Sequence, residues 1–494
     1  MRFGRNLAAG IAYTLITAAV SLAVVPLYLR YLGIEAYGLI GFNMTLQGVL
    51  QLLDLGLTPA VSREVARARE IRDAGGARTL LRTLEVVFWA VAALIGIGIA
   101  LSAPLIADRW LDAGTLGQGS VAAAVALMGI TIAARWPAGL YAGALVGAHR
   151  MTVVSALGVG YILIANLGVV LVLAFWSATI EAFFIWQAGC ALAYSLSARI
   201  AAWRVLEGRG GARFDLAKLR SIARFAIGLS GVALTGIVVT QLDKVMLSRL
   251  LPLSAFGQYM LATAVVTALY GFINAVFRVV FPRFTAVVTR GSEDELIGDY
   301  RLLTAGLGST WLPMMTVVAI CAHPLLLLWT GSPAVADATA PILSILAIGT
   351  ALHGMMYLPF SVQLAMGATR LPLTINLVLV AIQVPLIVLL TLRLGALGGA
   401  FAWLVLHLVY LHLGTFLMHR RIMRGWGLTW LWRDVYPRLG WCLVFGAAGA
   451  ALIARTDPPW LQLLVGAGAG LGAMGAALLS SGYRLAAFKR LLTT

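Results

Sequence analysis

The sequence predicts an all-α polytopic membrane protein with about fourteen transmembrane helices, and three observations lead to this fold class. Hydrophobic residues make up 61% of the 494-residue chain and charged residues only 11%, whereas a soluble domain carries roughly 25% charged residues. Apolar runs of about 20 residues, long enough to cross a bilayer, follow one another along the chain. The basic residues between these runs alternate in density, as they do on the two sides of a membrane.

Each expected span is an apolar run bounded by polar or charged residues. The runs are joined by short connections, the longest of about 20–25 residues. We expect transmembrane helices at 7–29, 37–57, 83–106, 119–144, 155–176, 179–203, 223–248, 255–281, 302–329, 339–366, 371–392, 395–418, 437–454 and 459–481.

The distribution of Lys and Arg sets the expected orientation. With the N-terminus in the cytoplasm, 28 of the 36 basic residues fall on the inner side and 6 on the outer side. The remaining two, Arg135 and Arg278, lie within spans. This bias follows the positive-inside rule, and an even number of spans returns the C-terminus to the cytoplasm. We therefore expect a multi-pass protein of the cytoplasmic membrane of a bacterium, with both termini inside.

The net charge of +17 is a feature shared with nucleic-acid-binding proteins. Here the basic residues form no single domain and instead flank the spans, so we expect the lipid bilayer as a partner and no nucleic acid. Histidine and cysteine show no metal-ligand spacing. We therefore expect no metal and no cofactor.

Short matches between the two halves of the chain indicate an internal repeat. YLGIEAYGL at 31–39 recurs as LLPLSAFGQ at 250–258, GAHR at 147–150 as GATR at 367–370, and FIW at 184–186 as FAW at 401–403. The nearly constant offset predicts two six-helix lobes of the same orientation, as in transporters with parallel repeats. We expect an N-terminal lobe at 1–203, a basic cytoplasmic linker at 204–222, a C-terminal lobe at 223–420, and two additional helices within 437–481. Glycines from Gly466 to Gly475 predict close packing of the last helix.

Seven segments, spread over about residues 1–425, carry a resemblance to a known family. They are LRYLGIEAYGLIGF (29–42), QLLDLGLTPAVSREVAR (51–67), WPAGLYAGALVGAHR (136–150), FFIWQAG (183–189), QLDKVMLSRLLPLSAFGQYMLA (241–262), LLLLWTGS (325–332) and LHGMMYLPFSVQLAMGATR (352–370). In their order they resemble the oligosaccharide flippases of polysaccharide biosynthesis, of the O-antigen type, in the multidrug/oligosaccharidyl-lipid/polysaccharide exporter superfamily.

The resemblance implies a V-shaped two-lobe fold and alternating access. It also implies a substrate that consists of an oligosaccharide on a polyprenyl pyrophosphate carrier, moved from the inner to the outer leaflet for surface polysaccharide such as lipopolysaccharide. Polysaccharide polymerases and glycosyltransferases are possible partners. Because charged and polar groups are costly in hydrocarbon, such a protein needs cations and hydrogen-bonding groups in a wet cavity between its lobes.

Two arginines within spans are candidates to bind the substrate. Arg135 lies about ten residues from the inner end of its span, roughly 15 Å by helical rise, which is too deep for easy snorkelling. It either contacts pyrophosphate or sugar, or makes a structural contact between helices. Arg278 lies closer to the inner end of its span, where it either faces the cavity or reaches the interface.

Polar residues within spans are the next candidates. Gln47, Gln51 and Asp54 are spaced to share one helix face, and Asn274 lies in the second half of the chain. These side chains either bind sugar hydroxyls in the cavity or form hydrogen bonds between helices.

A third group of residues could couple or gate transport. Asp54, the only carboxylate expected clearly inside a span, either pairs with Arg63 or binds a coupling proton or cation. Gln241, Asp243 and Lys244 lie near the outer end of their span. They form either an outer gate or a local salt bridge.

Other functions stay open on the sequence alone. An ion-coupled multidrug or small-molecule exporter, or a flippase for the peptidoglycan precursor, would share the fold. A scaffold for the assembly machinery is a weaker alternative. An integral-membrane glycan polymerase, ligase or glycosyltransferase would need acid–base or metal groups in an aqueous loop or cavity, and no paired carboxylates with such an arrangement are found in a loop. We therefore expect that the chain is not an enzyme.

Overall fold

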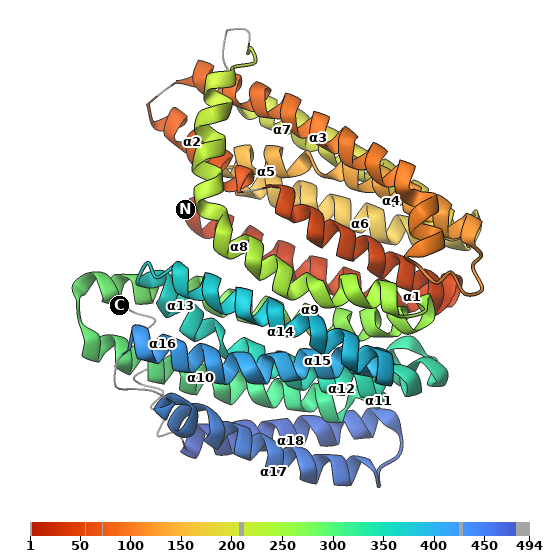
Figure 1. Cartoon of the computed structure of the whole chain (residues 1–494), viewed down its shortest axis with the longest axis vertical. Coiled ribbons are helices and arrows are strands. Elements are labelled where there is room, and N and C mark those ends of the chain that lie inside the picture. Colours follow the sequence, from red (N-terminus) through yellow and green to blue (C-terminus); the bar gives the residue numbers. More distant parts are fainter. Residues whose placement is uncertain (1, 55, 72, 207–211, 424–427, 481–494) are drawn as a thin grey trace. The chain divides into compact units, whose positions relative to one another are not determined.

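The computed structural model describes residues 2–54, 56–71, 73–206, 212–423 and 428–480, and within them every regular element is a helix. Eleven segments are long and apolar enough to cross a membrane. The predicted all-α membrane fold class is thereby confirmed (Figure 1). The chain forms two compact units, Met1–Gly257 and Gln258–Thr494, which we describe separately.

The number of fourteen spans stays a prediction. One of the eleven segments, Ile16–Asp54, has 39 residues, which as a straight helix would measure about 58 Å, nearly twice the thickness of the hydrocarbon core. It contains a break at Gly33, whose φ of 80° lies outside the helical region, so it corresponds to most of the two expected spans at 7–29 and 37–57. The expected spans at 179–203 and 223–248 are helical but do not belong to the eleven segments.

The first unit contains eight helices that lie wholly within it, counted over its described residues, and the start of a ninth. They are α1 (Arg2–Leu50), α2 (Leu57–Glu70), α3 (Ala74–Arg109), α4 (Gln118–Arg135), α5 (Ala138–Gly147), α6 (Met151–Phe175), α7 (Ile180–Val205), α8 (Leu216–Leu250) and the first turn of α9 (Leu253–Arg290). A 3₁₀ turn, η1 (Gln51–Asp54), follows α1. α8 starts inside the predicted linker 204–222.

Helix α2 is short and carries one apolar face. Its buried residues are Ala60, Val61, Val65 and Ala68. The first three belong to a core that also includes residues of α3, α5 and α7. Glycine allows α5 to approach α2 closely, because a Cβ at Gly147 would lie 2.3 Å from the Ser62 carbonyl oxygen. The arginines of α2 therefore lie on a helix that is anchored by its apolar face.

The repeated segments of the sequence meet at two glycines. A Cβ at Gly38 in α1 would lie 2.4 Å from the Leu253 carbonyl oxygen, and one at Gly257 would lie 2.3 Å from the Ile34 carbonyl oxygen. Gly38 and Gly257 are matched in the sequence repeat, at an offset of 219 residues. Only glycine permits this distance between the two backbones.

The second unit contains the rest of α9 and nine further helices, with two π-helical segments, in its described residues. They are α10 (Glu293–Ile320), α11 (Ala322–Thr330), α12 (Pro333–Met355), α13 (Tyr357–Ala365), α14 (Arg370–Leu394), α15 (Ala396–Val409), η2 (Tyr410–Gly414), α16 (Thr415–Arg421), η3 (Leu431–Val435), α17 (Tyr436–Ile453) and α18 (Pro459–Ser480). In both units a long helix breaks and continues as a short one, as α4 and α5 do in the first and α12 and α13 in the second. The predicted limits of the two lobes stay a prediction.

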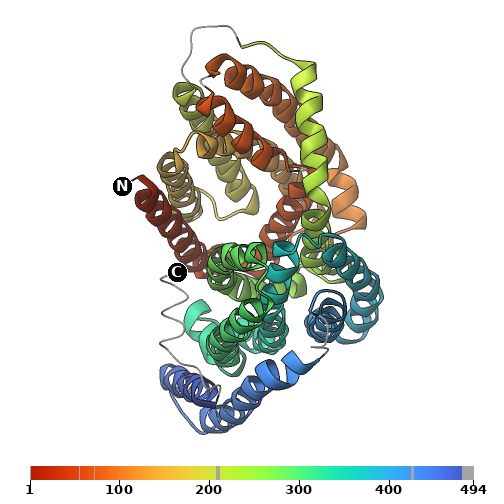
Figure 2. The same ribbon diagram turned by 90° about the vertical axis from the view of Figure 1, so that its left-hand side faces the viewer.

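The last two helices, α17 and α18, lie side by side (blue in Figures 1 and 2). A Cβ at Gly472 would lie 2.5 Å from Phe445 of α17, and one at Gly470 would lie 2.3 Å from Val317 of α10. These contacts confirm close packing at part of the glycine series. Gly468 and Gly475 have open space around them.

Candidate functional site

The candidate site of the first unit is built around the break between α4 and α5. Arg135 is the last residue of α4, and Pro137 is the N-cap of α5. Proline cannot donate a backbone hydrogen bond, so the helix is interrupted here. Ser195 of α7 donates its hydroxyl to the Ala134 carbonyl oxygen at 2.5 Å. Both Arg135 and the break lie within the candidate membrane segment Gln118–Gly147.

Arg135 contacts both an amide and an aromatic ring. Its Nη1 donates to Gln47 Oε1 of α1 at 2.9 Å, and its Cζ lies 5.1 Å from the centroid of the Tyr161 ring of α6, within cation–π distance. Tyr161 in turn stacks on Tyr194 of α7, with ring centroids 4.8 Å apart. Four helices thus hold a cation, an amide and two aromatic rings together.

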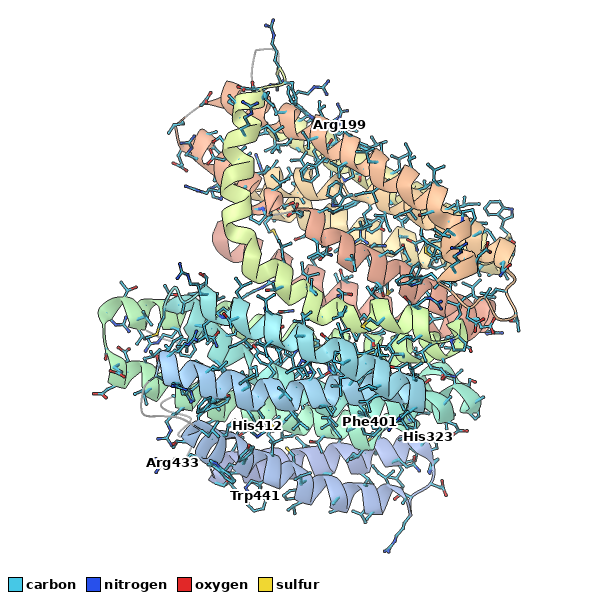
Figure 3. The ribbon with its side chains drawn as sticks, in the orientation of Figure 1. Arg199, His323, Phe401, His412, Arg433 and Trp441 are labelled. Carbon is cyan, nitrogen blue, oxygen red and sulfur yellow. The ribbon has the colours of Figure 1, made fainter. Side chains whose placement is uncertain are left out.

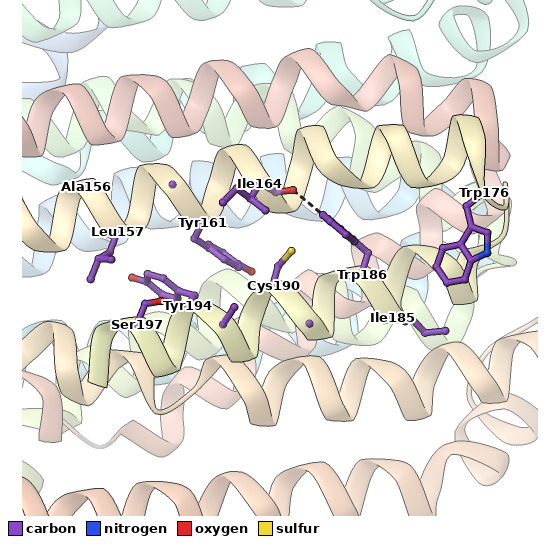
Figure 4. A pocket seen from close by; sticks show the side chains of 13 residues that line it. Ala156, Leu157, Tyr161, Ile164, Trp176, Ile185, Trp186, Cys190, Tyr194 and Ser197 are labelled. Carbon is purple, nitrogen blue, oxygen red and sulfur yellow. Dashed lines mark hydrogen bonds between the residues drawn. The ribbon is translucent and has the colours of Figure 1, made fainter. Parts of the chain in front are cut away.

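A cavity of about 440 Å³ adjoins this group between α6 and α7. Tyr161, Tyr194 and Trp186 line it, with the thiol of Cys190 and the hydroxyl of Ser197 (Figure 4). The Trp186 indole is held by a hydrogen bond from Nε1 to the Ile164 carbonyl oxygen at 3.1 Å. A mostly apolar cavity with a few polar groups is the usual form of a small-molecule site, and Arg135 contacts one of its lining rings, that of Tyr161.

The predicted polar face of α1 does not continue as one α-helical face. Helix α1 ends at Leu50, and Gln51 and Asp54 belong to the 3₁₀ turn η1. Gln51 is exposed. Asp54 accepts hydrogen bonds from the Thr58 hydroxyl at 2.7 Å and the Thr58 amide at 3.3 Å. Gln47 therefore points to Arg135, while Asp54 binds the first turn of α2.

The three candidates near the end of α8 do not form one group. Gln241 packs on Gly48 of α1, where an added Cβ would lie 2.8 Å from the Gln241 amide carbon. Lys244 Nζ lies 3.0 Å from Asp243 Oδ1 and donates to the Thr240 carbonyl oxygen at 2.7 Å. Of the two predicted alternatives for Asp243 and Lys244, the structure contains the local salt bridge.

Arg278 and Asn274 belong to the second unit. They are four residues apart on α9, on one helix face, and both side chains are exposed. Neither has a hydrogen bond or an ion pair to the described residues. They are accessible groups on the same stretch of α9, and their role in binding stays a prediction.

Glu85, the carboxylate with the most side-chain hydrogen bonds in the described part of the chain, was not a sequence candidate. It lies in the segment Gly75–Arg109, near the N-terminal end of the span expected at 83–106, and the expectation that Asp54 is the only carboxylate clearly inside a span stays a prediction. Glu85 is 2% exposed and accepts hydrogen bonds at 2.5–3.2 Å from four side chains, those of Arg82, Tyr141, Arg199 (labelled in Figure 3) and Trp203. It joins α3, α5 and α7. A buried carboxylate with this many donors is a structural link.

Histidines of the second unit also cluster without a signal in the sequence. The rings of His353 and His407 have centroids 4.5 Å apart, although they lie on α12 and α15. His353 Nδ1 is 2.5 Å from the Tyr270 hydroxyl, and His407 Nδ1 donates to the Trp403 carbonyl oxygen at 2.8 Å. Helix packing alone brings them together.

The fold is shared with solved transporters. The chain is similar to the lipid II flippase MurJ in an inward closed conformation, with a TM-score of 0.70 and 12% identity over 96% of this chain and 99% of that one. It is similar to a multidrug resistance MATE family transporter of the MOP superfamily in an inward-facing conformation. The TM-score is 0.64, with 14% identity over 83% of this chain and 96% of that one. It is also similar to a mutant of the Vibrio cholerae MATE transporter VcmN, with a TM-score of 0.57 and 17% identity over 85% of this chain and 96% of that one.

With the eleven apolar segments, these similarities define the class: a multi-pass membrane protein with the fold of the MurJ and MATE transporters. No curated protein matches the chain. A family model described as polysaccharide biosynthesis protein matches residues 3–288, which include all but the first two residues of the first unit. The chain belongs to this polysaccharide biosynthesis protein family. The resemblance inferred from the sequence motifs is thereby confirmed.

Proposed function

We propose that this protein is a flippase that moves polyprenyl-pyrophosphate-linked oligosaccharide from the inner to the outer leaflet of the bacterial cytoplasmic membrane, by alternating access. The product would supply the assembly of a surface polysaccharide such as O-antigen. Family membership and the shared fold support transport in polysaccharide biosynthesis. The observation that carries the proposal is the group formed by Arg135, Gln47 and Tyr161 inside a membrane segment.

The chemistry of this group suits the head of such a substrate. A pyrophosphate is anionic and cannot enter hydrocarbon without compensating charge. The guanidinium of Arg135 has five N–H donors, of which one bonds to Gln47, and its side chain is only partly buried. The remaining donors can bind phosphate oxygens in the bidentate way that arginine favours.

The groups beside Arg135 could bind the other two parts of the substrate, the sugar and the polyprenyl tail. The Gln47 amide is within reach of Arg135 and offers donors to sugar hydroxyls. The cavity beside Tyr161 and Tyr194 is mostly apolar, so it suits the start of a polyprenyl chain or the face of a sugar ring. We propose that Arg278 and Asn274, two exposed polar residues of the second unit, also bind the substrate.

Loss of the gene tests the proposal. A deletion strain should accumulate lipid-linked oligosaccharide that an externally added, sugar-specific lectin cannot reach in spheroplasts. The wild-type gene should restore lectin access. Arg135→Gln should restore it poorly, whereas Arg109→Gln, at an exposed residue at the end of α3, should restore it fully at equal protein level. Normal surface polysaccharide in the deletion strain would contradict the proposal.

Two alternative functions of the same fold would give the deletion strain different phenotypes. The structural similarity to a lipid II flippase favours a peptidoglycan-precursor substrate as the second candidate. In that case the deletion strain would accumulate peptidoglycan precursor and lose cell-wall integrity. A multidrug exporter would instead show altered drug sensitivity and unchanged polysaccharide. Accumulation of an unpolymerised, externally accessible glycan would favour a polymerase or a ligase.

A further inference from the structure

A cationic cavity lies in the second unit. It has a volume of about 320 Å³ and lies between α10, the start of α17 and the end of α18. Its lining residues are Arg301, Arg433, Asp434, Pro437, Arg438 and Ser480. Three arginines and one aspartate give it a formal charge of +2.

The bonding within the cavity leaves positive charge uncompensated. Asp434, the one acid, is bound by Arg301, whose Nε lies 3.3 Å from Asp434 Oδ2. Arg433 is exposed at the rim, in the segment that leads into α17 (Figure 3). Asp434 therefore offsets one arginine at most, and two guanidinium groups are left to attract an anion.

Arg438 is the strongest reason to expect a ligand. It is 3% exposed, and its side chain passes over Gly308 of α10, where an added Cβ would lie 2.9 Å from its Cδ. Its Nη1 donates to the Asp434 backbone carbonyl, but its Nε has no hydrogen-bond partner among the described residues. A buried charged donor without a partner is costly, and a bound anion would remove that cost.

The surroundings of the cavity favour a lipid as the source of this anion. Trp432 and Tyr436, from the same segment, pack edge to face with ring centroids 4.9 Å apart, and Trp432 is 69% exposed. Trp441 of α17 is partly exposed, and its indole Nε1 donates to the Ser480 hydroxyl at 3.0 Å. Exposed Trp and Tyr side chains are typical of the headgroup level of a membrane. By the distribution of basic residues, this end of α10 and α17 faces the cytoplasm.

We infer that this cavity binds the phosphate of an anionic phospholipid from the inner leaflet, with Arg433 and Arg438 as its cationic ligands. Basic pockets between transmembrane helices on the cytoplasmic side have this property. The bound lipid would join α10 to the last two helices at the membrane surface. The inference does not depend on which substrate the protein transports.

The test is lipid binding by the purified full-length protein. Native mass spectrometry in detergent, with dioleoylphosphatidylglycerol and dioleoylphosphatidylcholine added at matched concentrations, measures both affinities. The protein should bind phosphatidylglycerol more tightly, and Arg433→Gln or Arg438→Gln should each weaken that binding about fivefold, the effect of one basic residue near a lipid headgroup. Arg370→Gln, at an exposed arginine that also lies on the predicted inner side, is the matched control and should leave the binding unchanged.

Three results would overturn the inference. The first is equal affinity for the two lipids, and the second is equal loss of binding in the Arg370→Gln control. The third is full displacement of phosphatidylglycerol by millimolar inorganic phosphate, which would identify a site for the free anion. Because Arg433 is exposed, Arg433→Gln keeps the test decisive even if Arg438→Gln fails to fold.

Discussion

The Arg135 guanidinium donates a hydrogen bond to the side-chain oxygen of Gln47 at 2.9 Å, which joins α4 to α1 inside the membrane-spanning part of the first unit. The same guanidinium lies over the Tyr161 ring. This one residue therefore connects a polar and an aromatic neighbour, and its remaining donors can meet an anionic substrate. Substitutions of Arg135 and Tyr161 separate that function from simple helix packing.

Replacing Arg135 by Gln should reduce transport by roughly 10- to 100-fold, since a hydrogen bond to a charged group contributes about 1.5–3 kcal/mol. Arg135→Lys should retain part of the activity, because lysine keeps the charge and loses the planar contact with Tyr161. Initial rates of lectin-accessible glycan formation, at matched protein level, measure both. Equal rates for wild type and Arg135→Gln would show that the residue serves packing alone.

Tyr161 should contribute to transport through its aromatic ring rather than its hydroxyl. Tyr161→Phe keeps the face that contacts Arg135, so transport should be close to that of the wild type, whereas Tyr161→Ala should lower it about tenfold. The same glycan assay measures the difference. If the Phe and Ala variants were equally impaired, the hydroxyl rather than the ring would be the essential group.

Glu85 should contribute to stability more than any exposed acid of the first unit. Glu85→Ala leaves Arg82, Arg199, Tyr141 and Trp203 without their shared acceptor, at a cost of about 3–5 kcal/mol. The Tm of the purified protein in detergent should fall by several degrees. Glu70→Gln, at an exposed residue of α2, is the control with no expected change. An unchanged Tm for Glu85→Ala would refute the structural role.

The contact between α1 and the start of α9 predicts that glycines differ in how much an alanine substitution destabilises the protein. Gly38→Ala places a methyl group 2.4 Å from the Leu253 carbonyl oxygen, so the helices must separate, at a cost of about 1–3 kcal/mol. Gly98→Ala meets open space and should be neutral. Thermal unfolding of both variants, with the expression level in the membrane fraction, measures the difference. Equal stability of the two would show that the helices yield easily at Gly38.

The sequence was sufficient for the fold class and for the family, because hydrophobic runs, charge bias and ordered motifs are properties of the chain itself. Arg135 could be selected because an arginine so deep in an apolar run needs a partner. Its partner Gln47 was a candidate by type, but the bond between them depends on packing of α1 against α4. The sequence could not reveal that contact.

Other parts of the site could not be predicted for the same reason. Tyr161 and Tyr194 look like ordinary apolar-span residues until α6 and α7 place them together. Glu85 stands near the end of a predicted span, where a solvated acid is common, and its four donors come from three helices. The prediction that Gln47, Gln51 and Asp54 share one α-helical face was wrong. Gln51–Asp54 is a 3₁₀ turn, which the spacing rule for α-helices does not describe.

The most direct measurement of the central claim is flipping by the purified protein in proteoliposomes. Vesicles are loaded with a lipid-linked oligosaccharide on a polyprenyl pyrophosphate carrier, and the fraction accessible to an external lectin is followed after all external substrate has been masked. The account predicts that accessible glycan reappears with the wild-type protein, slowly with Arg135→Gln, and at the wild-type rate with Arg109→Gln. Reappearance at the same rate in protein-free vesicles and in vesicles with the wild-type protein would contradict it.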